Sequence, residues 1–295
     1  MRSMVQAADG RTLMYESWGA PDGEPVFLFH GTPGSRVGPH PRHSVLYRLG
    51  IRLICHDRPG YGGSDPLPGR TVAHAAEDVA AIADHLGLDR FAVVGRSGGA
   101  PHALACAALL PKRVTRVAVL VALAPWDAEG LDWYGGMTQS NIDEYRSAEA
   151  GYEVLAARIS AYADRIRRDP LAELPFDPAD LPIPDRRVVA DYSIRSMLLD
   201  NFIEALKDSD TGWIDDAYSF VRPWGFEVTA IERPVLLWHG ELDIFSPVAH
   251  SCWLARHIAG AELVLDKDSA HFGAMKVLPR VLNWLAEDST GRLVA

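Results

Sequence analysis

Short apolar runs alternate with longer amphipathic segments over residues 1–125 of the chain. Val26–Phe29 is continuously apolar, which is typical of a strand buried on both faces of a sheet. Apolar residues in Thr71–Leu86 recur every three or four positions, and this spacing predicts a helix. The same patterns predict further strands at Met4–Ala7, Leu13–Trp18, Ile51–Cys55, Phe91–Val94 and Val117–Leu123, and further helices at Ser44–Leu49 and Ala100–Leu110.

Strands that alternate with helices predict an α/β fold with a mostly parallel, doubly wound sheet. The alternation stops at Pro125, and residues 126–225 are rich in proline and show helical patterns near 140–168 and 186–208. Regular alternation returns with strands at Val235–Trp238 and Glu262–Leu265 and helices at Val248–Ile258 and Leu278–Ala286. We therefore expect a core of residues 1–125 and 226–295, with a helical insertion at 126–225 after the sixth strand.

Composition narrows the class of protein. The chain has 295 residues, 48% of them hydrophobic, which is enough for one large core with an insertion. The three cysteines, Cys55, Cys106 and Cys252, are far apart, which argues against a disulfide framework or a zinc-thiolate site. No apolar run is long enough for a secretory or membrane segment, so we expect a cytoplasmic protein without a membrane partner.

The charge of the chain is unevenly distributed. The net charge is −10, which argues against a nucleic-acid partner because phosphate binding needs clustered positive charge. Residues 126–225 hold 20 acidic and 10 basic side chains, and the remaining residues hold 19 of each. If the insertion folds over an active site, this excess predicts a preference for neutral or cationic substrates.

The sequence Gly95-Arg96-Ser97-Gly98-Gly99 lies between a predicted strand and a predicted helix. This G-x-S-x-G pattern is typical of a nucleophile elbow, in which small residues flank a serine on a sharp turn. The helix that follows directs free N–H groups toward the serine, where an oxyanion would develop. A glycine-rich turn with a capping serine would show the same five letters, but the strand-turn-helix context favours a catalytic Ser97.

A serine nucleophile needs a base and a group that orients the base. Asp243 follows the predicted strand at Val235–Trp238, and His271 follows the last predicted strand. Ser97, Asp243 and His271 therefore occur in the order serine, acid, histidine. Asp127, which follows the sixth predicted strand, is an alternative for the acid.

Five motifs in this order resemble the α/β-hydrolase superfamily: His30-Gly31-Thr32-Pro33-Gly34, Asp57-Arg58-Pro59-Gly60-Tyr61-Gly62-Gly63-Ser64, the Ser97 elbow, His239-Gly240-Glu241-Leu242-Asp243 and Ala270-His271-Phe272. The resemblance covers nearly the whole chain and implies the α/β-hydrolase fold, with residues 126–225 as its lid. It also implies that the backbone N–H groups of Thr32 and Gly98 form an oxyanion hole. His30 and His239 are expected to have structural roles.

Other residues are candidates for the substrate pocket. Arg96 is an unusually large cation beside the nucleophile; it could bind an anionic substrate group, but pairing with Asp57 or an acid of the insertion is the favoured interpretation. The aromatic and methionine side chains of the insertion could line an apolar pocket or simply form its core, and the candidates are Trp126, Trp133, Tyr134, Met137, Trp213 and Trp224. No H-E-x-x-H or complete phosphate-loop motif occurs, so no metal or nucleotide cofactor is expected.

The resemblance implies a serine hydrolase that cleaves a small to medium carboxylic ester or lactone through an acyl-enzyme. The alternatives within the same fold are an aminopeptidase similar to proline iminopeptidases, a cofactor-free lyase or oxygenase, and a ligand receptor. The expected partner is a small-molecule substrate, and a homo-oligomer is possible. The sequence does not select the substrate.

Overall fold

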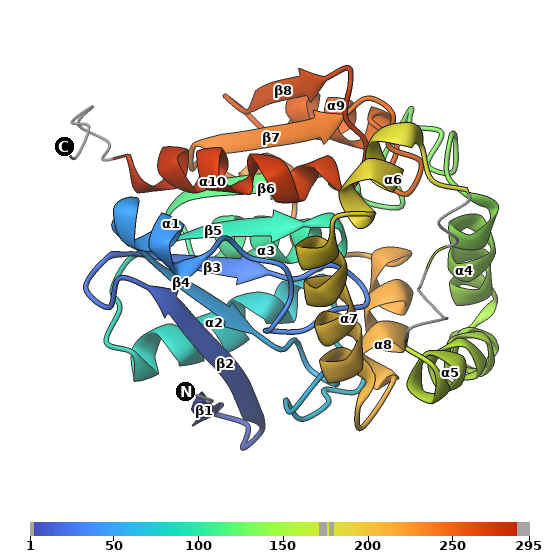
Figure 1. Cartoon of the computed structure of the whole chain (residues 1–295), viewed down its shortest axis with the longest axis horizontal. Coiled ribbons are helices and arrows are strands. Elements are labelled where there is room, and N and C mark those ends of the chain that lie inside the picture. The colour runs from blue at the N-terminus through green and yellow to red at the C-terminus, as the bar shows by residue number, and fades with distance from the viewer. Residues whose placement is uncertain (1–2, 171–175, 177–179, 288–295) are drawn as a thin grey trace.

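An eight-stranded sheet runs through the centre of the structure, a computed structural model that describes residues 3–170, 176 and 180–287 (Figure 1). The strand order is β1-β2-β4-β3-β5-β6-β7-β8; β2 is antiparallel to β1 and β4, and all other neighbours are parallel. The strands are β1 (Ser3–Gln6), β2 (Thr12–Gly19), β3 (Glu24–Phe29), β4 (Ile51–His56), β5 (Phe91–Arg96), β6 (Val114–Leu120), β7 (Val235–Gly240) and β8 (Glu262–Asp266). The predicted α/β architecture is confirmed.

Helices cover both faces of the sheet. On one face, α1 and α10 pack on the apolar side chains of the central strands, and on the other face α2, α3 and α9 do so (Figure 1). These helices are α1 (His43–Arg48), α2 (Ala75–His85), α3 (Ala100–Leu109), α9 (Ala249–His257) and α10 (Gly273–Ala286), with short 3-10 helices η1 (Val72–His74), η2 (Ser97–Gly99) and η3 (Val228–Ala230). The strands between these helices are buried on both faces, which explains their continuous apolar runs.

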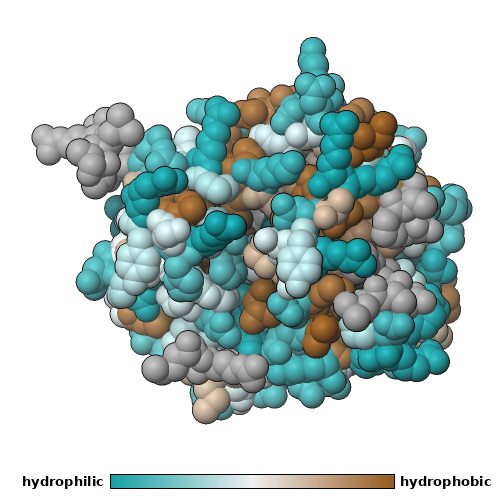
Figure 2. All heavy atoms as spheres, in the orientation of Figure 1, coloured by the Kyte–Doolittle hydropathy of each residue, from teal (hydrophilic) through white to brown (hydrophobic). Residues whose placement is uncertain are grey.

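In the described part of the segment between β6 and β7 there are five further helices: α4 (Gln139–Ala150), α5 (Tyr152–Arg168), α6 (Ile183–Val189), α7 (Tyr192–Leu206) and α8 (Thr211–Phe220). In Figure 1 they gather at the edge of the sheet toward which the arrows of β5 and β7 point. This edge holds the carboxyl ends of the parallel strands, where ligands bind in open α/β sheets. Figure 2 shows hydrophobic groups scattered among hydrophilic ones on the face viewed.

Several predicted boundaries are corrected. The helical pattern near 140–168 corresponds to two helices, which are separated at Gly151 because no helix accommodates its φ of 136°. The sixth strand covers Val114–Leu120 instead of Val117–Leu123, because Val121 adopts a positive φ of 49° that ends the strand. The last helix begins at Gly273, before the predicted start at Leu278, and includes Pro279.

Candidate active site

Ser97 lies where the central strand β5 turns into α3. Its φ is 54°, in the left-handed region that non-glycine residues rarely adopt. A Cβ on Gly95 would lie 2.3 Å from the carbonyl oxygen of Gly99, and a Cβ on Gly99 would lie 2.4 Å from that of Phe29. The expected strand-turn-helix geometry is therefore present, and it requires glycine at both flanking positions.

The backbone of Thr32 lies against the elbow. A Cβ on Gly98 would lie 3.2 Å from the backbone nitrogen of Thr32 and 2.2 Å from its Oγ1. Both residues line the same cavity as Ser97. The structure thus brings together the two residues expected to form an oxyanion hole.

Asp243 and His271 are in direct contact. The Oδ2 of Asp243 lies 2.8 Å from Nδ1 of His271, and its Oδ1 accepts hydrogen bonds from the backbone N–H groups of Phe245 (2.8 Å) and Ser246 (3.2 Å). His271 lines the cavity together with Ser97. Asp127, the alternative acid, is exposed to solvent and makes no such contact within the described residues.

His30 and His239 are buried, and each of their ring nitrogens lies within hydrogen-bond distance of a protein group. The Nδ1 of His239 lies 2.6 Å from Oγ of Ser251, and its Nε2 lies 2.7 Å from the carbonyl oxygen of Ser246. The Nδ1 of His30 lies 2.8 Å from the carbonyl oxygen of Gly31, and its Nε2 accepts the backbone N–H of Arg58. These contacts agree with the structural roles expected for both histidines.

Ser97, Thr32, Gly98 and His271 open into a cavity of about 430 Å³ between the core and the insertion. Its walls combine aromatic and aliphatic side chains of both parts, namely Leu123, Tyr145, Ile159, Tyr162, Phe176, Leu198, Phe202, Trp213, Phe245, Phe272 and Met275. Walls of this kind are typical of sites for small apolar molecules.

Of the seven predicted pocket residues, Arg96 and Trp213 line the cavity and the other five do not. The buried indoles of Trp133 and Trp224 donate to the carbonyl oxygens of Ala124 and Phe220. The indole of Trp126 is exposed and donates to a surface carboxylate, and Met137 is buried in the main apolar core. Tyr134 packs edge-on against Trp133 in the same core. The pocket prediction for Trp126, Trp133, Tyr134, Met137 and Trp224 is therefore corrected.

Arg96 does not have the partner favoured by the sequence analysis. Asp57 pairs instead with Arg36, and within the described residues no carboxylate lies within ion-pairing distance of Arg96. The Arg96 guanidinium donates to the carbonyl oxygen of Pro39 at 3.4 Å. Burial lowers the pKa of Arg96 to about 10, so it remains a cation at neutral pH.

Glu144 on α4 is the acidic residue among the described residues that line the cavity, and Arg96, Arg158 and Arg165 are the basic ones. The acidic excess of the insertion is therefore not found among the described residues that line the cavity, and the preference for neutral or cationic substrates stays a prediction. An oxygen of Glu144 accepts the indole N–H of Trp213 at 3.1 Å. Burial raises the pKa of Glu144 to about 7. No feature of the sequence distinguished this residue, because its position depends on how α4 packs.

Asp185 on α6 also reaches the site. Its Oδ1 accepts the backbone N–H of Phe272, next to His271, at 2.8 Å. Burial raises the pKa of Asp185 to about 6, although the charge of His271 opposes this shift. Phe245 and Phe272 could have been found from the sequence, since they lie within two residues of Asp243 and His271.

The described residues contain no group of three or more His, Cys, Asp or Glu side chains arranged to hold a metal ion. In the part of the chain that the structure describes, no helix has the length and apolar character needed to cross a bilayer.

Comparison with known proteins identifies the family. Residues 24–141 match the family model of the alpha/beta hydrolase fold. The non-heme haloperoxidase of Rhodococcus erythropolis is 30% identical over 254 residues, 84% of each chain. The bifunctional esterase/perhydrolase DCH of Acinetobacter calcoaceticus is 32% identical over 122 residues, 41% of this chain and 44% of the relative. The bromoperoxidase structure from Bacillus anthracis aligns with a TM-score of 0.72 at 22% identity, covering 98% of this chain and 100% of that one. The chain therefore belongs to the α/β-hydrolase superfamily.

Proposed function

We propose that this protein is a serine hydrolase that cleaves a small to medium carboxylic ester or lactone through an acyl-enzyme. The observation that carries the proposal is the contact of 2.8 Å between Asp243 and His271, on the wall of the cavity that also contains Ser97 at a strained elbow. Strain of this kind persists where the surrounding structure holds a residue in a functional geometry.

Each step of the proposed reaction uses a group at this site. His271 accepts the hydroxyl proton of Ser97 as the oxygen attacks the substrate carbonyl, and Asp243 stabilises the imidazolium that forms. The backbone N–H groups of Thr32 and Gly98 stabilise the oxyanion. His271 then returns the proton to the leaving oxygen, and water releases the acid from Ser97 by the reverse sequence.

The substrate class follows from the cavity. A volume of about 430 Å³, lined by aromatic and aliphatic side chains together with polar and charged ones, suits a small to medium acyl or alkoxy group. The esterase activity named for the Acinetobacter calcoaceticus relative supports an ester substrate, and that relative matches 41% of this chain.

Covalent labelling tests the proposal. A fluorophosphonate should add one adduct per chain, and p-nitrophenyl esters of increasing acyl length should be hydrolysed until the acyl group exceeds the cavity. Ser97→Ala should abolish the adduct and lower kcat by up to about 10⁶-fold, as in other triads of this type. Labelling that persists in Ser97→Ala, or a wild-type protein that neither labels nor hydrolyses any ester, contradicts the proposal.

Glu144 favours a second candidate, an aminopeptidase acting on a substrate with a free amino group. A carboxylate on the cavity wall can pair with a substrate ammonium, and the loop at His30–Gly34 resembles that of proline iminopeptidases. Because burial raises the pKa of Glu144 to about 7, the KM for amino-acid p-nitroanilides should fall as pH rises through 7, and Glu144→Gln should raise this KM and weaken its dependence on pH. Hydrolysis of p-nitrophenyl esters without any cleavage of the anilides rejects this candidate.

A further inference from the structure

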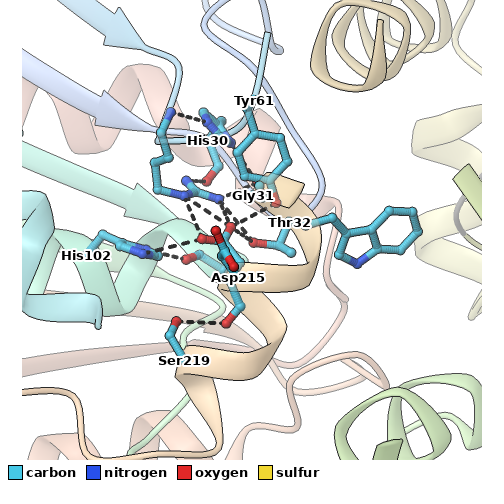
Figure 3. Close-up of polar contacts among 12 residues, drawn as sticks. His30, Gly31, Thr32, Tyr61, His102, Asp215 and Ser219 are labelled. Carbon is cyan, nitrogen blue, oxygen red and sulfur yellow. Dashed lines mark hydrogen bonds and ion pairs between the residues drawn. The ribbon is translucent and has the colours of Figure 1, made fainter. Parts of the chain in front are cut away.

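A buried carboxylate of the insertion lies directly behind the loop that carries Thr32. Asp216, on α8, is 0% exposed and accepts side-chain hydrogen bonds from four residues, the shortest from each being those of Thr32 Oγ1 (2.6 Å), Tyr61 Oη (2.9 Å), Arg58 Nη2 (2.5 Å) and Arg70 Nη2 (2.7 Å). We call these five residues the Asp216 cluster. In Figure 3, Thr32, Tyr61 and His102 point toward one central group of carboxylate and guanidinium atoms, and Ser219 donates to the backbone carbonyl oxygen of Asp216.

The charges of the cluster fix the direction of its hydrogen bonds. Burial alone would raise the pKa of Asp216, but Arg58 and Arg70 hold it well below its usual range. An ionised carboxylate only accepts hydrogen bonds, so the hydroxyl of Thr32 must donate to Asp216. Because the hydroxyl hydrogen of Thr32 is donated to Asp216, the donor that Thr32 has left for a ligand in the cavity is its backbone N–H.

Arg58 extends the same support along the loop. Its guanidinium donates to the carbonyl oxygens of His30 (2.5 Å) and Gly31 (2.9 Å) and to Oγ1 of Thr32 (3.0 Å). Farther along, the backbone N–H of Ser35 donates to Oδ1 of Asn201 on α7 at 2.8 Å. Residues 30–35 are thus held by charge-assisted hydrogen bonds to Arg58 and Asp216 and by the hydrogen bond to Asn201.

We propose that Asp216 is a positioning residue for the oxyanion hole. It does not line the cavity, and it acts through the Thr32 hydroxyl and Arg58 to hold the Thr32 backbone N–H beside Ser97. Through Asp216, helix α8 of the insertion therefore supports the oxyanion hole from outside the cavity. The inference rests on the proposed function, since an oxyanion forms only when Ser97 attacks a carbonyl.

Thr32→Val tests the link while all charges of the cluster remain. Valine keeps the shape and the backbone N–H but cannot donate to Asp216. A displaced oxyanion donor weakens the transition state more than the bound substrate, so kcat should fall by about 10- to 100-fold with KM changed by less than about threefold. Thr32→Ser restores the hydroxyl and should recover most of the lost kcat.

Asp215 provides a matched control for Asp216. It is the preceding residue on α8 and is also buried, but it accepts from Tyr152 Oη (3.0 Å), lies 4.0 Å from Nε of Arg70, and has no hydrogen bond or ion pair with residues 30–32. Asp216→Asn should lower kcat at least as much as Thr32→Val, whereas Asp215→Asn should stay within about threefold of wild type. The double variant Thr32→Val/Asp216→Asn should lose less than the product of the two single losses, because both break the same bond.

Counting the active sites that still react with a fluorophosphonate distinguishes a folding defect from a displaced oxyanion donor. A fluorophosphonate titrates Ser97 in each variant, and kcat for a p-nitrophenyl ester is expressed per labelled site. A Thr32→Val protein that labels fully and retains wild-type kcat overturns this inference and leaves the proposed function intact. An equal loss in Thr32→Ser and Thr32→Val also overturns it. A wild-type protein that does not label overturns the proposed function, and the inference with it.

Discussion

The carboxylate of Asp243 is buried and surrounded by hydrogen-bond donors. Burial alone would raise its pKa, but the charge of His271 and the hydrogen bonds from His239 and His271 lower it below the ordinary value. The pKa of Asp243 therefore lies far below neutral pH, and the group remains ionised when an imidazolium forms at His271. This is the property that the acid of a serine triad requires.

Replacing each of the two candidate acids by asparagine tests whether Asp243 is the acid of the triad. Asp243→Asn should lower kcat on the order of 10⁴-fold, because the amide stabilises the wrong imidazole tautomer. Asp127→Asn should change kcat by less than about threefold, since its carboxylate is exposed. The measurement is ester hydrolysis per fluorophosphonate-labelled site. If Asp127→Asn is the more damaging change, the acid has been assigned to the wrong residue.

At the scale of elements, the turn from β5 to α3 leaves no room for a side chain at Gly95 or Gly99. A Cβ at either position would collide with a backbone carbonyl oxygen, while Ser97 between them has a positive φ. The strand and helix can therefore be joined this closely only with glycine at both positions. The joint brings the N-terminus of α3 to the nucleophile, where its free N–H groups favour an anion.

Gly95→Ala should destabilise the fold strongly, because its Cβ would lie 2.3 Å from a backbone oxygen that cannot move aside. We expect a loss of about 3 kcal/mol or more in the free energy of unfolding, measured with urea. Gly87→Ala is the control: its φ is positive but no atom lies within 4 Å, so it should lose only about 1–2 kcal/mol. Equal losses in the two variants would contradict the predicted collision at Gly95, whose φ lies outside the left-handed region.

The two sets of elements differ in how well the sequence predicts them. Strand ends of the core carry Ser97, Asp243 and His271, and their order along the chain and the resemblance of their motifs predicted that they lie together. Asp243 contacts His271, and Ser97 lines the same cavity as His271. For the insertion, the pocket residues were predicted from its aromatic and methionine content alone, and this content does not indicate which face of a helix lines the cavity. Trp133 and Trp224 therefore proved to be core residues, and Glu144 and Asp216 were not foreseen, because their roles depend on how α4 and α8 pack.

At the scale of the whole molecule, the interior contains neutral histidines. Burial is the largest cause that lowers the pKa of His30, His56, His102 and His250, to about 3 for His56 and about 4 for His250. In the unfolded chain these side chains bind protons below pH ~6.5, whereas in the folded protein they stay neutral. The unfolded state therefore binds more protons as pH falls, and these four groups make the fold less stable toward acid. The raised pKa of Asp185 opposes this slope over part of the same range.

His56 isolates the contribution of one such group. Both of its ring nitrogens are buried without a hydrogen-bond partner among the described residues, and its ring packs edge-on against Phe29 at 5.1 Å. His56→Phe removes one titrating group, so between pH 6 and 4 the stability of wild type should fall more steeply than that of the variant, by about 1.4 kcal/mol per pH unit. Urea unfolding at several pH values measures the two slopes. Phe27→Leu serves as the control, because the buried Phe27 ring packs edge-on against Phe91 and its replacement should lower stability by about 1 kcal/mol at every pH without changing the slope. Parallel slopes for wild type and His56→Phe would mean that His56 takes up its proton in the folded state, which its burial against Phe29 and the nearby Arg58 charge argue against.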